Sequence, residues 1–355
     1  MKKAVILIFV VAAGMGACHN FDVEHPDYVK TNGYFSYQFP VRTIILGDYI
    51  YDNSNDNESK CVISAHIGGV RNNKIDRKFT IEVDNSLCDN ILFRSGGDPV
   101  VAMPENYYTL SSYSELVVPK GEMFGGVEVQ LTEAFFNDIL SIKNTYVVPI
   151  RLKSSNDVDS ILSGYTDFPD ADDRIASQWS IAPKNFTMYA VKYINEYDAV
   201  YLHYGKSSVK DGNGTVLGDS LYKERSVEYN RTYKLSTTGR RTVQTASIPF
   251  RAKSNTGMAG TYQLVLNFDN NNQCKIEAPD GVSYTVSGTG SFIPNPKVGN
   301  YTYNDWNQKY RDVIEVNYSI SNESGNTYTA EEFFVIQNRD VKLETYSPAI
   351  ATLTP

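Results

Sequence analysis

Apolar and polar residues alternate along much of this chain with a period of two. Val127, Val129 and Leu131 are separated by single polar residues, which is the period of a strand with one buried face. The same alternation recurs in 79–83 and in 313–318. The pattern therefore predicts an all-β protein.

Turn signals divide the first half into short strands. Clusters of turn-forming residues at 52–59 and 72–74 separate runs rich in β-branched and aromatic residues. Strands at this spacing indicate an antiparallel, immunoglobulin-like β-sandwich. One helix is expected, at Glu133–Leu140 with Thr132 as its N-cap. The strands expected here, besides those above, are 34–39, 43–46, 62–67, 107–110 and 146–152.

A polar stretch over 154–184 has few apolar residues, and we expect it to be a linker between domains at 28–153 and 185–355. Hairpin turns are expected at 269–272 and 280–281. Consecutive antiparallel strands either close into a lipocalin-like barrel or stack as a second sandwich, and alternation alone does not choose between these. Strands expected in the second domain are 187–193, 199–204, 227–235, 246–251, 262–268, 283–286, 313–320 and 332–337.

The N-terminus predicts export and lipid attachment. Two lysines precede the apolar run Ala4–Ala13, which is shorter than the roughly 20 residues of a membrane-spanning helix. The sequence MGAC then ends at Cys18 and is typical of a bacterial lipobox, in which a peptidase cuts before the cysteine and the thiol carries lipid. We expect a signal peptide over 1–17, lipidation of Cys18 and a tether over 18–27. The alternative is an ordinary secretory signal with Cys18 as a bystander.

The residues after Cys18 bear on localisation. Asp22 and Glu24 resemble the signal that directs Bacteroidetes lipoproteins to the outer face of the outer membrane. Two or three acyl chains form a durable anchor, because each buried CH₂ contributes about 0.8 kcal/mol. We therefore expect a lipid-anchored outer-membrane protein exposed at the cell surface.

Charge and cysteines exclude some classes. The formal net charge is −8, with the acidic residues scattered, which excludes the basic stripe of a nucleic-acid-binding protein. Cys61, Cys88 and Cys274 remain after the lipobox, and an odd number excludes a complete disulfide framework. We expect buried free thiols, with a Cys61–Cys88 bridge as the alternative.

The sequence contains no HExxH, Walker A, nucleophile-elbow or CxxC motif. No catalytic, cofactor-binding or metal-binding residue is therefore expected. His66 and His203 stand alone, and His203 is expected to point outward from its strand. Asp211–Gly214 is expected to form a hairpin turn, because it lacks the glutamate and flanking helices of a calcium loop.

Aromatic residues suggest one candidate site. The chain has 26 Tyr, 16 Phe and 2 Trp, and tyrosine suits half-wet binding sites because it combines an apolar face with a polar tip. Tyr301, Tyr303 and Trp306 lie in a loop-like stretch between strands, where binding residues are common. They form our candidate platform for stacking sugars. The alternative is that Trp306 closes one end of the barrel.

Several segments resemble known families. The first half resembles an immunoglobulin-like domain without assigned chemistry, common in Bacteroidetes surface lipoproteins and shared with surface endo-β-N-acetylglucosaminidases. The second half resembles a partner domain of unknown function that often accompanies it. The resemblance implies a protein of a glycan-utilisation locus and assigns no binding residue. The segments that carry it are 34–43, 68–70, 107–110, 118–121 and 146–149, then 189–195, 311–313 and 332–339.

These observations favour a non-catalytic surface lipoprotein that binds an oligosaccharide or glycan beside a starch-utilisation-type uptake complex. One alternative is a structural or adhesive surface protein without a sugar ligand. Another is an enzyme with an unrecognised site.

Overall fold

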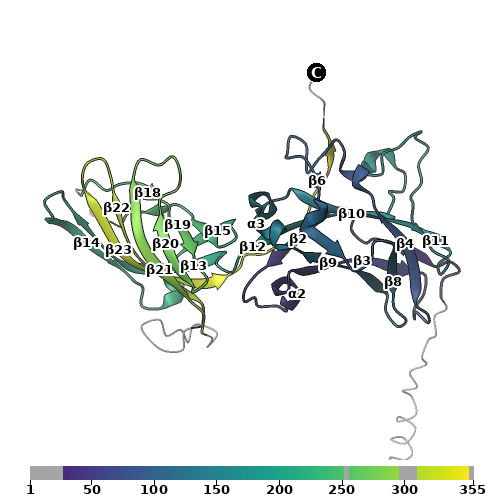
Figure 1. Cartoon of the computed structure of the whole chain (residues 1–355), viewed down its shortest axis with the longest axis horizontal. Helices are drawn as coiled ribbons and strands as arrows, with labels where there is room; N and C mark the ends of the chain where they lie inside the picture. Colours follow the sequence, from purple (N-terminus) through teal and green to yellow (C-terminus); the bar gives the residue numbers. More distant parts are fainter. Residues whose placement is uncertain (1–26, 252–255, 296–309, 352–355) are drawn as a thin grey trace, which may run out of the picture.

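The computed structural model describes residues 27–251, 256–295 and 310–351. In this part of the chain a β-sandwich and a β-barrel lie end to end (Figure 1). The predicted all-β, two-domain fold is confirmed. Cys18, Tyr301, Tyr303 and Trp306 lie outside the described residues. Among those residues, no helix has the length and apolar character needed to cross a membrane.

Two sheets form the sandwich. The first has the order β11 (Ser160–Ile161), β1 (Asn32–Tyr34), β3 (Lys60–Gly68), β9 (Phe124–Leu131), β7 (Tyr108–Leu110). The second has the order β24 (Glu344–Thr345), β2 (Pro40–Ile45), β12 (Phe186–Ile194), β10 (Tyr146–Ser154), β4 (Arg77–Val83), β8 (Glu115–Val118), with β6 (Val101–Ala102) also paired to β10. A short pair joins β5 (Ile91–Leu92) to β25 (Ala349–Ile350).

The main core of the sandwich lies between these sheets. Ile63 and Val129 from the first sheet pack with Phe79 and Ile150 from the second. The second sheet also buries its other face, where Met188 of β12 packs in a separate apolar cluster with Tyr346 of the C-terminal segment. Burial on both faces explains why Tyr146–Ile150 is a continuous buried run.

Helices are short. The predicted helix at 133–140 is present as α3 (Glu133–Asn137) with Thr132 at its N-cap, and a 3-10 turn (Ile139–Ile142) follows it. The turn cluster at 52–59 contains α2 (Ser54–Asn57). The other 3-10 turns are Asn85–Cys88, Glu105–Tyr107, Ala176–Gln178 and Val227–Tyr229.

The second domain is a closed antiparallel barrel of eight strands, so the structure selects the barrel over a second sandwich. Closure comes from pairing of its first and last strands, in which Val200 lies opposite Asn338 and Lys210 opposite Thr327. In order the strands are β13 (Ala199–Lys210), β15 (Arg231–Gly239), β16 (Thr242–Thr245), β19 (Val265–Phe268), β20 (Gln273–Glu277), β21 (Thr285–Ile293), β22 (Val313–Ser321) and β23 (Thr327–Asn338).

Further short strands extend the barrel wall. β14 (Val216–Tyr222) pairs with the second half of β13, after the turn predicted at Asp211–Gly214, where the Gly214 N–H donates to Asp211 O at 3.0 Å. β17 (Ile248–Pro249) pairs with β18 (Thr261–Tyr262). The expected turns at 269–272 and 280–281 connect β19 to β20 and β20 to β21.

The crossing between domains differs from the expected linker. Residues 186–194 form β12, which lies between β2 and β10 inside the sandwich, so the chain enters the barrel only after Asn195. The stretch 154–184 packs on the sandwich, where the Arg174 guanidinium donates to Leu87 O and Asp89 O at 3.0 and 2.7 Å. Polar residues hold this segment through backbone contacts, which an apolar pattern does not reveal.

The three described cysteines, Cys61, Cys88 and Cys274, are free and buried. Burial raises the pKa of each thiol to about 12. At neutral pH they are protonated and behave as small apolar side chains.

Candidate functional site

The two domains meet where the chain crosses between them, and Arg339 stands at the centre of this contact. It follows the last residue of β23 and is 5% exposed. Its guanidinium uses all five N–H groups. Nη1 donates to Leu46 O and Asp48 O, both at 3.0 Å, Nη2 donates to Leu46 O at 3.1 Å and Asn195 O at 2.6 Å, and Nε donates to Asp198 O at 2.7 Å. One side chain therefore ties the sandwich loop 46–48 to the crossing segment.

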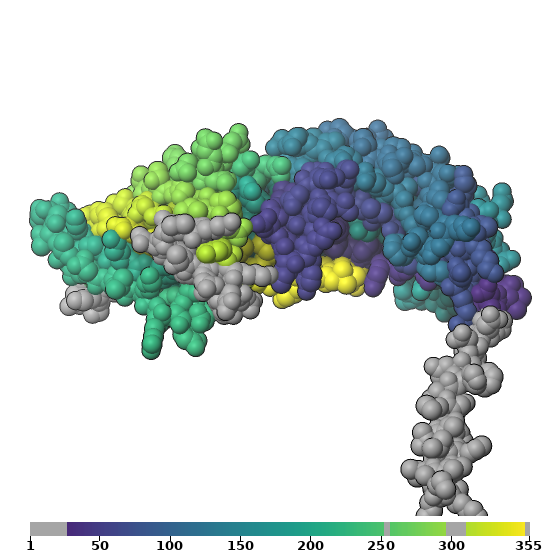
Figure 2. Space-filling model, turned by 90° about the horizontal axis from the view of Figure 1, so that it is seen from below, coloured from purple at the N-terminus to yellow at the C-terminus, as the bar shows by residue number. Residues whose placement is uncertain are grey.

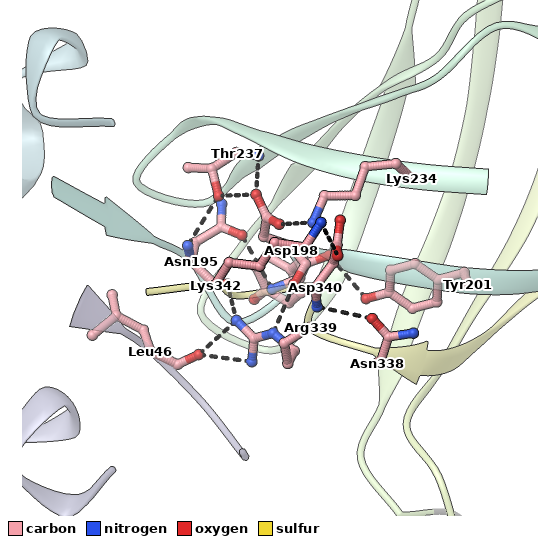
Figure 3. Close-up of polar contacts among 11 residues, drawn as sticks. Leu46, Asn195, Asp198, Tyr201, Lys234, Thr237, Asn338, Arg339, Asp340 and Lys342 are labelled. Carbon is pink, nitrogen blue, oxygen red and sulfur yellow. Dashed lines mark hydrogen bonds and ion pairs between the residues drawn. The ribbon is translucent and has the colours of Figure 1, made fainter. Parts of the chain in front are cut away.

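A second set of contacts secures the barrel side of the junction (Figure 3). Asp198 Oδ2 accepts from the Thr237 N–H at 2.6 Å and from its hydroxyl at 2.9 Å. Asp198 Oδ1 lies 2.7 Å from Lys234 Nζ. The Asn195 amide donates to Gly239 O and Thr242 O at 3.0 Å each. These bonds fix the crossing segment against β15 and β16.

Gly47 permits the close approach of the sandwich loop. Its φ is +81°, and a Cβ there would lie 2.7 Å from Glu196 Cβ. Both the backbone angle and the space favour glycine. In the space-filling view, residues of the first domain, in purple, lie directly against the green and yellow barrel (Figure 2).

A cavity of about 490 Å³ opens beside Arg339, and we call it the junction cavity. The sandwich contributes Asp48, Tyr49 and Ile50, while the barrel contributes residues that follow β21, residues directly before β22, and residues at and just beyond the end of β23. Its volume is within the usual range of ligand pockets. The barrel residues that line it are Asn295, Tyr310, Arg311, Asp312, Ile336, Gln337, Asn338, Arg339, Asp340 and Val341.

Aromatic and apolar groups form the rim of the junction cavity. Ile50 is 79% exposed and Tyr310 is 42% exposed. Tyr49 is half-buried and meets Tyr51 edge to face, with 5.6 Å between ring centroids. Flat, partly exposed rings beside polar groups are suited to ligands that have an apolar face and a polar edge.

Polar groups also line the cavity, where Asp48 and Asn295 are exposed and Asp312 is buried. The buried Asp312 carboxylate accepts from the Asn295 N–H at 2.9 Å, and the Asn295 amide donates to Asp48 Oδ2 at 3.2 Å. Burial raises the pKa of the Asp312 carboxyl. Arg311 Nη1 donates to Gln337 O at 3.2 Å. Hydrogen-bond donors and acceptors of the cavity are therefore held in place before any ligand enters.

The sequence-predicted platform cannot be placed directly, because Tyr301, Tyr303 and Trp306 lie outside the described residues. The described residues on either side of that segment, Asn295 and Tyr310, both line the junction cavity. Stacking by the three predicted residues stays a prediction. Sequence reasoning missed Asp48, Tyr49 and Asp312, because their association depends on how the domains dock.

The expectation for His203 was wrong. The side chain is fully buried and lies inside the barrel, with Nε2 3.0 Å from Oε2 of the equally buried Glu332. This contact is electrostatic when His203 is protonated, since Nε2 makes no aligned hydrogen bond. The error arose because the neighbours Leu202 and Tyr204 are also buried, in an apolar cluster on the outer side of the wall. Alternation cannot identify the inner face when both faces are covered.

Glu332 is the centre of a buried polar cluster. Its carboxylate accepts from Tyr222 at 2.6 Å, Tyr318 at 2.7 Å and Tyr262 at 3.2 Å. Burial raises the pKa of the carboxyl, but nearby His203 and the tyrosine hydroxyls outweigh it, so the pKa is lowered. Among the described residues, no group of three histidine, cysteine, aspartate or glutamate side chains is placed to hold a metal ion.

Comparison with known proteins identifies the domains. Residues 196–340 match the family model of a domain of unknown function, DUF5627. Residues 28–159 match a second model, described as an N-terminal domain. The first match begins directly after Asn195, where the chain enters the barrel. No curated protein matches the sequence.

Two solved structures from Bacteroides ovatus are only distantly similar. One is a multidomain protein including DUF1735, with 12% identity, a TM-score of 0.39 and coverage of 88% of this chain and 99% of that one. The other is provisionally named a carbohydrate-binding protein, with 12% identity, a TM-score of 0.29 and coverage of 90% and 100%. Likenesses this slight support no argument about the present chain.

A third Bacteroides ovatus structure, of a protein of unknown function, is much more similar. It is 32% identical with a TM-score of 0.81, and the alignment covers 92% of this chain and 100% of that one. Identity and coverage at this level extend over both domains. The chain therefore belongs to the same family as this two-domain Bacteroides protein of unknown function, and its barrel is a DUF5627 domain.

Proposed function

We propose that this protein is a non-catalytic, glycan-binding lipoprotein of the outer-membrane surface, with its binding site in the junction cavity. The observation that carries the proposal is the composition of that cavity, in which Tyr49 and Tyr310 lie beside Asp48, Asn295 and Asp312. Sugar rings present C–H faces that stack on aromatic rings, and hydroxyls that both donate and accept hydrogen bonds. The cavity offers partners for both.

Prior ordering of the cavity supports binding. Arg339 fixes the loop that carries Asp48 and Tyr49, and Asn295 already bonds to Asp48 and Asp312. Ligand binding would therefore lose little conformational entropy in ordering these groups, which favours affinity. The site still offers few aromatic anchors, so we expect dissociation constants in the micromolar to millimolar range. About 1 mM corresponds to roughly −4 kcal/mol.

The arrangement of the domains suits surface display. The first described strand, β1, pairs with β11 at the end of the sandwich away from the barrel (Figure 1). A lipid anchor at Cys18 would hold that end near the membrane and place the junction cavity and the barrel farther out. From there the protein would present glycan to a starch-utilisation-type uptake complex. Lack of turnover is part of the proposal, because the sequence carries none of the catalytic motifs considered above.

A glycan array tests the proposal. We would apply soluble protein lacking residues 1–18, and we expect it to bind one class of host or dietary oligosaccharide. Incubation with the bound glycan should release no shorter product by chromatography. Binding to no member of a broad array would reject the glycan ligand and favour a structural or adhesive role. Hydrolysis of a bound glycan would contradict the non-catalytic assignment.

A further inference from the structure

A second, larger hollow lies on the outer wall of the barrel, and we call it the outer groove. It has a volume of about 700 Å³ and crosses β14, β13, β23 and β22. These strands extend to the end of the barrel away from the sandwich (Figure 1). From Val200, near the junction, to Ser207 in the groove, β13 covers roughly 20–25 Å at about 3.3 Å per residue.

Strand register explains why the wall is hollow at this place. One cross-strand row of paired residues consists of Leu221, Lys206, Glu331 and Asn317. The next row on the same face consists of Asp219, Ser208, Thr329 and Ser319. The central side chains of the first row are long, and those of the second are short. The short row forms a depression bordered by the long one.

The groove presents both hydrogen-bond donors and hydrogen-bond acceptors. Lys206 Nζ lies 2.7 Å from Glu331 Oε2, and these side chains are 60% and 55% exposed. The pair is neutral overall, so Asp219 gives the residues that line the groove a net negative charge. Leu221, 79% exposed, adds an apolar surface at one end. The hydroxyls of Ser208 and Thr329 lie between these groups.

This chemistry favours a neutral, polyhydroxylated ligand. An anionic ligand would meet Asp219 and Glu331. A peptide strand binds mainly through free backbone groups at a sheet edge, and β13, β23 and β22 are paired on both sides where they form the groove floor. In the described sheet β14 keeps one free edge, so a peptide strand would add beside β14 rather than lie across the groove floor. A saccharide needs no free backbone, because its hydroxyls can bond to side chains of either polarity.

We propose that the outer groove is a second saccharide-binding site, so that one chain contacts a polysaccharide at two places. This inference rests on the proposed function for the ligand class, but its residues are separate from those of the junction cavity. A polymer bound at the junction holds further sugars near the groove at high effective concentration, which strengthens overall binding. A short oligosaccharide cannot reach both sites. The two-site arrangement therefore predicts a preference for polymer.

Native gel electrophoresis with starch, galactomannan, xylan or yeast mannan in the gel tests the inference. Thr329→Trp fills the groove, while Thr232→Trp places the same bulk on an exposed part of β15 outside it. For the polysaccharide that retards the wild type most, we expect Thr329→Trp to weaken retention about tenfold or more. Thr232→Trp should behave like the wild type. Calorimetry with a tetrasaccharide of that polymer should give the same affinity for all three proteins.

The outcomes separate the two proposals. Equal retention of wild type and Thr329→Trp would overturn the outer groove and leave the junction cavity standing. Loss of tetrasaccharide binding in Thr329→Trp, with circular dichroism unchanged, would place the primary site in the groove and overturn the junction cavity. Failure of all four polymers to retard the wild type, together with a blank glycan array, would overturn both. Thermal melts of both tryptophan variants that match the wild type would show that the barrel is intact.

Discussion

The carboxylate of Glu332 and the imidazole of His203 face each other inside the barrel, with 3.0 Å between Oε2 and Nε2. Tyr222, Tyr262 and Tyr318 donate to the same carboxylate. The cluster thus joins β13, β14, β18, β22 and β23 through one side chain. A buried charge is tolerated when its hydrogen bonds are complete, and this one stabilises a single arrangement of the strands.

Glu332→Gln should therefore destabilise the barrel at pH 7 by about 2–5 kcal/mol, because the tyrosine donors lose a charged acceptor. The pKa of Glu332 lies below its usual 4.5, so the carboxylate's contribution is full above that value and is lost as the pH falls through the lower, folded-state pKa. The variant should lack this part of the acid sensitivity. Denaturant titrations from pH 7 to pH 3 measure both effects.

Glu331→Gln is the matched control, since Glu331 is exposed on the outer wall and pairs only with Lys206 among the ion pairs of the described residues. Its effect should stay within about 0.5 kcal/mol. A wild type and Glu332→Gln that lose stability in parallel below pH 5 would show that the cluster does not contribute as described.

Arg339→Lys should loosen the junction. Lysine keeps the charge but presents three donors from one point, and cannot reach the four carbonyl oxygens that the guanidinium contacts. We expect a loss of about 2–4 kcal/mol and partial separation of the two domains' melting transitions in calorimetry. Arg231→Lys, an exposed arginine on β15, should melt like the wild type. Identical melting curves for both variants would contradict the role given to Arg339.

The domain boundary can be tested with two fragments. Residues 196–340 contain the complete barrel, and we expect this fragment to fold alone. The fragment 185–355 also carries β12 and the C-terminal segment, whose apolar side chains pack in the sandwich. Exposing Met188 and Tyr346 should cause it to aggregate, which size-exclusion chromatography would show. A soluble, monomeric 185–355 fragment and an unfolded 196–340 fragment would support the boundary expected from sequence.

The sequence predicts where strands lie better than it predicts which strands pair with each other. A period of two locates β9, β4 and β22, because each buries one face against a core. The period of two does not assign β12 to a domain, because the apolar pattern of Phe186–Ile194 would suit a strand of the sandwich or of the barrel. Barrel closure depends on pairing between residues more than a hundred positions apart, such as Lys206 with Glu331.

The candidate sites follow the same rule. The junction cavity combines residues 48–50 with residues near 310 and 338, and no local pattern connects them. Glu332 did leave a signal, because it is a lone charge in phase with the apolar Tyr328, Ala330 and Phe334. Such a residue points either to solvent or to a buried polar partner, and the pattern alone does not decide between the two.

The lipid anchor is tested at Cys18. Cys18→Ala should abolish incorporation of labelled palmitate and release the protein from the membrane fraction, because the thiol is the expected site of lipid attachment. Cys88→Ala, which alters a buried thiol, serves as the control and should remain in the membrane fraction. Unchanged labelling and fractionation of Cys18→Ala would reject the anchor.

The most direct test of the central claim is calorimetric titration of an array-selected oligosaccharide into wild type, Tyr310→Ala and Tyr229→Ala. Tyr310 lines the junction cavity, whereas Tyr229, 74% exposed, does not. Removing one stacking ring should weaken binding about three- to tenfold, or roughly 0.5–1.5 kcal/mol. The account predicts this loss for Tyr310→Ala and wild-type affinity for Tyr229→Ala. Equal affinity for all three proteins would contradict binding in the junction cavity.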